Sequence, residues 1–147
     1  MTSFAEPGAS RRAARERAFE LLYQADVMGE RPADVLRSVE APPDPYVVDL
    51  LEFVDRHGPT LDGLIESRLR EDWSWERIPH VERALLRLGA AELIGVPEVP
   101  TAVVLAEAVD LAQRYTTPEG AKFVNGLLAE LARELRTSDD GDPMNEV

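Results

Sequence analysis

The fold is decided by the stretch of residues 79–94, which reads PHVERALLRLGAAELI. Its apolar residues recur at helical spacing and fall on one broad face: Val81, Ala84, Leu85, Leu88 and Ala91, widened by Leu86, Leu93 and Ile94. Pro79 suits the first turn of a helix, and the segment GVPEVP at residues 95–100 ends it. A helix with so wide an apolar face needs neighbours on several sides. We therefore expect residues 79–94 to form the central helix of the molecule.

Helical spacing of apolar residues continues on both sides of this stretch. It predicts helices over residues 10–28, 33–39, 46–56, 61–69, 101–115 and 118–136. Ser10 is a suitable N-cap for the first helix, and Gly29 ends it. The pattern contains no strand signal, so the predicted fold is all-α, a compact bundle of about six or seven helices. Residues 10–136 would form one domain, preceded by a flexible N-terminus at residues 1–9 and followed by an acidic, disordered tail at residues 137–147.

The composition excludes several classes of protein. The 147 residues include 28 acidic and 16 basic side chains, a formal net charge of -12, so nucleic acid would be repelled unless the cations gather in one place. Because the chain has no cysteine and only two histidines, it can hold neither a disulfide nor a cysteine-rich zinc site. We find no acid/base pair, no glycine-rich phosphate loop and no metal or cofactor motif, and predict a protein that is not an enzyme. A signal peptide and a membrane-spanning segment are both missing from the pattern, which predicts a cytoplasmic protein.

The cations do gather near the N-terminus, where residues 11–17 read RRAARER. On a helix, Arg12, Arg15, Phe19 and Tyr23 fall within a sector of about 80°. Guanidinium groups grip phosphates, and aromatic rings beside them provide stacking platforms for single-stranded nucleic acid. The alternative is that both rings border the core while the arginines only solvate a surface helix. The residues alone leave both interpretations open.

A second candidate anion site lies at the start of the last predicted helix. Thr117, Pro118 and Glu119 are typical of a helix N-terminus, and Lys122 and Phe123 follow in or near the first turn. Free backbone N–H groups and the helix dipole favour an anion there, which indicates a phosphate site near Thr116, Thr117 and Lys122. The alternative is that the threonine merely caps the helix and Phe123 belongs to the core.

Four segments of the chain, taken together, carry a family resemblance. They are RRAARERAFELLYQ at 11–24, VERALLRLGAAEL at 81–93, VP at 99–100 followed by EAVDLA at 107–112, and KFVNGLL at 122–128. In this order they resemble the NusB family of bacterial transcription antitermination and rRNA-processing factors, and the resemblance extends roughly over residues 10–136. The segment at 122–128 is the most specific match.

The resemblance implies an all-helical fold of two packed halves and a non-enzymatic RNA-binding function. The family's partners would be the single-stranded boxA element of nascent rRNA leaders and NusE, a small-subunit ribosomal protein, together with other Nus factors and RNA polymerase. By motif match, the RNA contacts would be Arg11, Arg12, Arg15, Tyr23, Lys122 and Phe123. Glu82 matches the acidic position that faces NusE. The chain departs from the family pattern at Pro118 and at Gly120–Ala121, which affects the fine RNA contacts more than the fold.

Two alternative functions remain open. NusB-like domains also resemble the RNA-recruiting N-terminal part of certain rRNA cytosine methyltransferases, although this chain ends shortly after its last predicted helix. The other alternative is a helical protein-interaction module that could form a homodimer and would not bind RNA directly.

Overall fold

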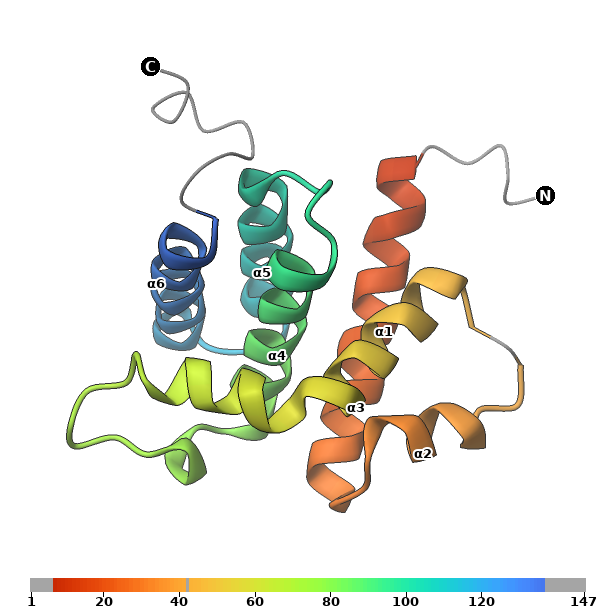
Figure 1. The fold of residues 1–147 in the computed structure, drawn as a ribbon, viewed down its shortest axis with the longest axis horizontal. Coiled ribbons are helices and arrows are strands. Elements are labelled where there is room, and N and C mark those ends of the chain that lie inside the picture. Colours follow the sequence, from red (N-terminus) through yellow and green to blue (C-terminus); the bar gives the residue numbers. More distant parts are fainter. Residues whose placement is uncertain (1–6, 42, 137–147) are drawn as a thin grey trace.

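The computed structural model describes residues 7–41 and 43–136, and these residues form helices, turns and loops without a strand. The elements in order are α1 (Pro7–Met28), α2 (Pro32–Ser38), α3 (Pro45–Glu66), the 3-10 helix η2 (Trp75–Arg77), α4 (His80–Gly95), α5 (Thr101–Tyr115) and α6 (Pro118–Leu135). The predicted all-α fold is confirmed. Figure 1 shows α1 and α2 on one side and α4, α5 and α6 on the other, while α3 extends from the side of α1 to a place below α4 and α6. The parts of the expected terminal segments at 1–6 and 137–147 lie outside the described residues.

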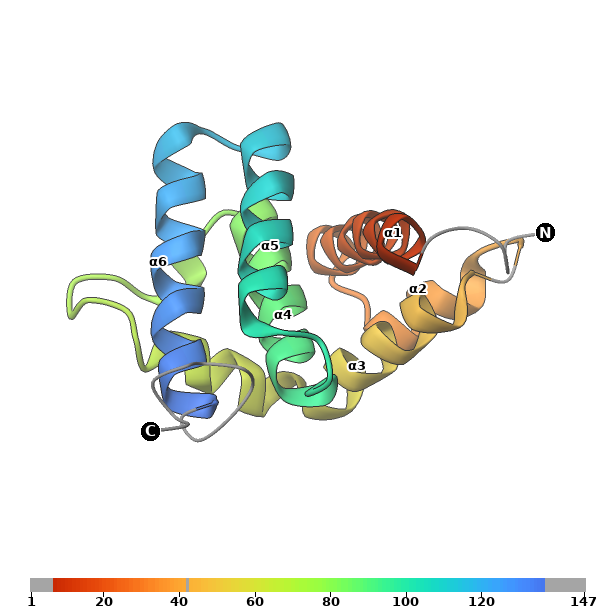
Figure 2. The ribbon, with the colours of Figure 1, turned by 90° about the horizontal axis from the view of Figure 1, so that it is seen from above.

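Helix α4 lies at the centre, as its wide apolar face predicts. It packs against α1, α3, α5 and α6, and Ala84, Leu85, Leu86, Ala90 and Ala91 are fully buried. Seen from above, α5 and α6 run side by side on one flank of α4 while α1 lies on the other (Figure 2). A Cβ atom at Gly89 would come within 2.6 Å of Leu128 Cδ1, so this glycine allows α6 to approach α4 closely. Helix α4 therefore joins the two halves through one continuous core.

The helix ends mostly follow their sequence signals. Gly29, with φ of +68°, ends α1, where the Glu30 N–H donates to the Ala25 carbonyl at 2.9 Å as in a Schellman motif. Helix α1 begins at Pro7 rather than at Ser10. Separate helices were predicted over 46–56 and 61–69; within α3 the backbone of His57 is not helical and divides the element into two helices at this place, although the second one ends at Glu66. Pro59 explains the kink, since proline offers no backbone N–H to the preceding turn.

A buried polar cluster connects α4 to α1 and α3. The Arg15 Nε–H donates to both carboxylate oxygens of Glu92, at 2.9 and 2.8 Å, and the Tyr46 hydroxyl donates to the same carboxylate at 2.5 Å. Arg15 and Glu92 are only 4% and 1% exposed. Burial, reinforced by the hydrogen bond to Glu92, raises the pKa of Tyr46 and keeps the phenol protonated. The Glu92 carboxylate on α4 is thus held by α1 through Arg15 and by α3 through Tyr46.

A second ionic cluster joins the same three helices nearer the α1 C-terminus. Asp26 of α1 accepts hydrogen bonds from Arg83 at 3.0 Å and from Arg87 at 2.9 Å, and it also contacts His80. Arg87 in turn donates to both carboxylate oxygens of Asp62 on α3 at 2.9 Å. Burial acts to raise the pKa of Asp26, but the hydrogen bonds with His80 and Arg87 outweigh burial and lower it. Asp26 therefore stays ionised between the two arginines.

The buried side chain of Arg136, directly after α6, contacts the end of α4 and the turn that follows it. Its guanidinium donates to the carbonyls of Leu93 at 2.9 Å, Val99 at 2.6 Å and Val96 at 3.0 Å. These carbonyls lie at the end of α4 and in the turn to α5, where a helix leaves its last acceptors without partners. The end of α6 thereby fixes the turn between α4 and α5.

Replacement of Glu92 tests the buried cluster. Glu92→Ala leaves the Arg15 guanidinium buried without a counter-charge, and we expect the free energy of unfolding to fall by about 3–5 kcal/mol in urea denaturation. The double variant Arg15→Met/Glu92→Met should recover part of this loss, because it leaves no buried charge. The control is Glu52→Ala on the exposed face of α3, which we expect to change stability by at most about 0.5 kcal/mol. Equal effects of Glu92→Ala and Glu52→Ala would contradict the assignment.

Candidate nucleic-acid interface

The basic segment of α1 presents two of its three predicted arginine contacts at the surface. Arg12 is the most open, with 64% of its side chain exposed. Its Nε–H donates to both carboxylate oxygens of Glu107 on α5 at 3.2 Å, and its Nη2 to one of them at 3.0 Å. Arg11 is half-buried, and its guanidinium carbon lies 4.0 Å from the centre of the Tyr46 ring. Arg12 thus contacts α5, whereas Arg11 contacts α3.

Arg15 and Phe19 differ from the expectation of an open arginine and aromatic face. Arg15 is buried against Glu92, and Phe19 is 3% exposed. The helical sector that contains them packs against α4 and α5 instead of facing solvent. Phe19 lies 4.8 Å from the ring of Tyr115, at the end of α5. Arg15 accordingly supports the α1 surface from beneath in this structure.

Tyr23 and Tyr115 form the exposed part of an aromatic row. Each is 39% exposed, and the Phe19 ring lies between them, 6.3 Å from Tyr23 and 4.8 Å from Tyr115. The Tyr115 hydroxyl donates to Glu16, and Arg114 donates to the same carboxylate at 3.0 Å. These two hydrogen bonds lower the pKa of Glu16. Tyr115 was not identified from the sequence, because its position beside α1 depends on the packing of α5.

Glu82 lies where α4 meets the turn between α5 and α6. It is 7% exposed, and its Oε2 accepts a hydrogen bond of 2.6 Å from the Thr116 hydroxyl. Gly120 packs directly against this pair, so that a Cβ atom there would lie 2.6 Å from Thr116 Oγ1 and still closer to the Glu82 carboxylate. The Gly120 departure from the family pattern therefore has a local steric reason. Glu82 fixes the start of α6, whether or not it also faces a partner.

Lys122 and Phe123 lie in the first turns of α6. Thr117 caps this helix by accepting a hydrogen bond of 3.0 Å from the Gly120 N–H, which takes up one of the donors that an anion at the helix start would use. Lys122 is exposed and Phe123 is partly buried. The Phe123 ring stacks on Trp73, with ring centres 6.2 Å apart and planes inclined by 28°. The aromatic surface is therefore larger than the sequence predicted.

A groove of about 520 Å³ surrounds this aromatic pair. Four cationic side chains contribute to its lining: Arg68, Arg70, Lys122 and Arg133. Trp73, 46% exposed, provides an open aromatic plane among them. Trp73 was not identified as a site residue from the sequence, because the loop after α3 meets α6 across more than 45 residues of sequence. Cations around an open ring are the arrangement that binds single-stranded nucleic acid.

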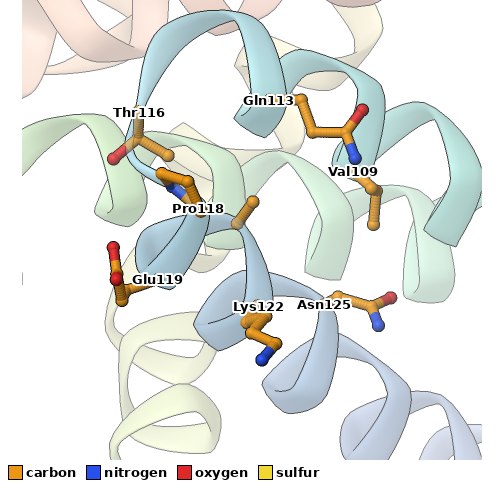
Figure 3. Close-up of a pocket in the computed structure, with 8 residues that line it drawn as sticks. Val109, Gln113, Thr116, Pro118, Glu119, Lys122 and Asn125 are labelled. Atoms are coloured by element: carbon orange, nitrogen blue, oxygen red, sulfur yellow. The ribbon is translucent and has the colours of Figure 1, made fainter.

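A second groove, of about 480 Å³, adjoins the first at Lys122. Figure 3 shows it between α5 and α6, with Val109 and Gln113 on one side, Lys122 and Asn125 on the other, and Thr116, Pro118 and Glu119 at the turn. Lys122 lines both grooves. A series of contacts runs from this turn through Thr116 and Tyr115 to α1. The α1 segment and the start of α6 are thus both in contact with the C-terminal end of α5 or the residue after it.

Two glycines of α6 give a matched test of the Glu82 contact. Gly120→Ala would force apart the Glu82–Thr116 pair, and we expect a loss of about 1–3 kcal/mol in the free energy of unfolding. Gly126→Ala meets no atom within 4 Å, and we expect a gain of about 0.5–1 kcal/mol from its better helix propensity. Urea denaturation measures both variants. A gain in stability in Gly120→Ala would contradict the close approach.

Among the described residues, no helix combines the length and apolar character needed to span a bilayer.

Comparison with known proteins assigns the chain to a family. The model of the NusB family matches residues 12–133. Transcription antitermination protein NusB of Kineococcus radiotolerans is 43% identical over 133 residues, which cover 88% of this chain and 97% of that protein. The corresponding protein of Acidothermus cellulolyticus is 40% identical over 141 residues, with coverage of 93% and 97%.

Solved structures agree with these relatives. T. maritima NusB superposes with a TM-score of 0.76 at 29% identity, covering 84% of this chain and 91% of that one. A chain from the crystal structure of antitermination factors NusB and NusE in complex with dsRNA gives a TM-score of 0.75 at 32% identity, covering 86% and 98%. The family resemblance in the sequence is confirmed, and the relatives are named as transcription factors rather than as enzymes. The chain belongs to the NusB family of transcription antitermination proteins.

Proposed function

We propose that this protein binds, together with NusE, a boxA-type single-stranded element of nascent rRNA leaders. In doing so it supports rRNA transcription and maturation within a complex that also contains other Nus factors and RNA polymerase. The proposal is supported by the solved relative in which NusB and NusE are in complex with dsRNA. The observation that carries it on this chain is the groove in which four cationic side chains surround the open Trp73 ring and its partner Phe123.

The residues of α1 and the groove at the start of α6 would make different contributions to RNA binding. On α1, Arg12 and Arg11 would contact phosphates, with Tyr23 nearby as a stacking ring. On α6, Lys122 would contact the backbone while Trp73 and Phe123 stack on bases. Arg15, because it is buried, would act by holding α1 in place. Neutralising about three or four phosphates of a single strand gives a modest salt dependence, with a slope of about -2 to -3.

So small a footprint explains why a partner would be needed. The net charge of -12 opposes RNA binding, whereas the same charge favours association with a basic ribosomal protein. NusE would then supply cations that this chain lacks. We include Glu82 as a NusE contact on the motif match; because the residue is only 7% exposed, it would act on the basic partner mainly through its charge.

RNA titration with purified components tests the function. We expect fluorescently labelled boxA RNA to bind the protein markedly more tightly with NusE than without it, because the partner adds phosphate contacts. Binding of equal strength in both titrations would contradict the adaptor function. Failure of the protein to bind RNA at all, in a folded sample that still binds NusE, would favour a protein-interaction module.

Two variants test separately the contribution of α1 and that of the aromatic groove to RNA binding. Arg12→Gln should reduce the magnitude of the salt slope by about 0.7, the value of one single-strand phosphate. Trp73→Ala should weaken binding about tenfold or more through lost base stacking, with little change in the salt slope. The control for Arg12→Gln is Arg56→Gln, an equal charge change at an exposed position of α3. Equal effects of Arg12→Gln and Arg56→Gln would remove Arg12 from the site.

A calorimetric titration with NusE alone tests Glu82. Glu82→Gln should weaken NusE binding, because it removes a negative charge that would face a basic partner. Thr116→Val serves as the control, since it breaks the hydrogen bond to Glu82 and keeps the charge. Equal loss in both variants would assign Glu82 a purely structural part.

A further inference from the structure

Glu107 on α5 occupies an unusual place beneath the arginine-rich surface. Its carboxylate accepts the hydrogen bonds from Arg12 and lies 3.8 Å from Arg15 Nη1. The Glu107 side chain is 14% exposed, whereas that of Arg12 is 64% exposed. Arg12 therefore lies over Glu107, between the carboxylate and solvent. The hydrogen bond and charge of Glu107 raise the pKa of Arg12, so the pair stays ionised.

Glu107 holds the Arg12 guanidinium in the way that a phosphate would. A guanidinium group presents its Nε and Nη2 donors as a fork that matches both carboxylate and phosphate oxygens. Glu107 accepts from this fork at 3.0–3.2 Å. An RNA phosphate must either displace Glu107 from this edge or approach Arg12 from the Nη1 side, with the carboxylate charge still beside it. In both cases Glu107 reduces the attraction between Arg12 and the phosphate.

The neighbouring cations are compensated in the same manner. Arg15 is paired with Glu92, and Arg114 with Glu16 and Asp110. Along α1 and α5 each of these arginines therefore has a carboxylate within 3.0 Å. Among these pairs, that of Arg12 combines the most exposed guanidinium with a carboxylate placed below it. Arg12 is accordingly the arginine whose attraction for an RNA phosphate depends most directly on a single carboxylate, which a substitution of Glu107 would remove.

We propose that Glu107 sets the RNA affinity of the arginine-rich surface by acting as an intramolecular counter-ion of Arg12 in place of an RNA phosphate. The inference rests on the proposed RNA-binding function and adds that a carboxylate of the protein itself limits the RNA affinity. Sequence-independent binding to RNA depends mainly on phosphate neutralisation. A carboxylate that offsets one arginine weakens that binding for every RNA, while base stacking at Trp73 and Phe123 is left unchanged. Glu107 thereby lowers the affinity for every RNA by a similar factor, so that phosphate contacts alone hold an RNA less tightly.

The test compares Glu107→Gln with the unmodified chain, both in complex with NusE. The probes are boxA RNA and a scrambled RNA of the same length and base composition. We expect Glu107→Gln to bind both RNAs about fivefold more tightly at low salt, with a salt slope steeper by less than about 0.7, because Arg12 already neutralises part of one phosphate beside Glu107. The control is Glu52→Gln, which makes the same change in net charge at an exposed position of α3 and should leave both quantities unchanged.

A double-mutant cycle shows whether Glu107 acts through Arg12. In an Arg12→Gln background, the further change Glu107→Gln should have almost no effect on affinity, since there is no guanidinium to release. Circular dichroism and thermal unfolding verify that the variants are folded, and Glu107→Ala is the second variant if Glu107→Gln is unstable. Unchanged or weaker RNA binding by folded Glu107→Gln would overturn the proposal, as would an equal gain with and without Arg12. If the unmodified complex does not bind boxA RNA, the proposed function itself fails.

Discussion

The carboxylate of Glu92 is the interaction on which the arrangement of this molecule depends. An ionised side chain that is 1% exposed requires partners, and it finds them in Arg15 of α1 and Tyr46 of α3. Its backbone carbonyl also accepts a hydrogen bond from Arg136 at 3.3 Å. Apolar contacts would allow α1 to rotate or slide against α4 at little cost, whereas a carboxylate with a bidentate contact does not. One residue therefore fixes how the N-terminal helices lie against the C-terminal ones, and with them the orientation of the arginine-rich segment.

The same constraint bears on how an acidic protein could bind RNA, as proposed above, without a strongly basic face. Carboxylates are placed below or beside the arginines of α1 and α5, and these pairs order long side chains that would otherwise be mobile. Ordered guanidinium groups lose less conformational freedom when they bind a phosphate. The aromatic groove at the start of α6 adds base stacking, which is insensitive to net charge. Recognition on such a surface depends on geometry more than on total charge.

Much of the fold could be predicted from the sequence, because helix periodicity, proline and glycine act locally. The central helix, the end of α1 at Gly29 and the start of α6 at Pro118 follow from such signals. The break after residue 56 was also predicted, because Pro59 interrupts the hydrogen bonding locally, whereas the end of the second part of α3 at Glu66 was not. The site was harder to predict. A helical wheel places Arg15 next to Arg12, but the partner that buries Arg15 lies 77 residues away. The contact of Trp73 with Phe123 is likewise tertiary, and no local pattern indicates it.

The position of Arg136 has a consequence for the order in which the parts of the molecule can fold during synthesis. Its guanidinium supplies the partners for carbonyls around the end of α4, some 40 residues earlier in the chain. While the chain is being synthesised, α4 and α5 emerge from the ribosome before this side chain does, and their connecting turn must wait with its acceptors bound only to water. The C-terminal half therefore reaches its final geometry only after the end of α6 has been synthesised.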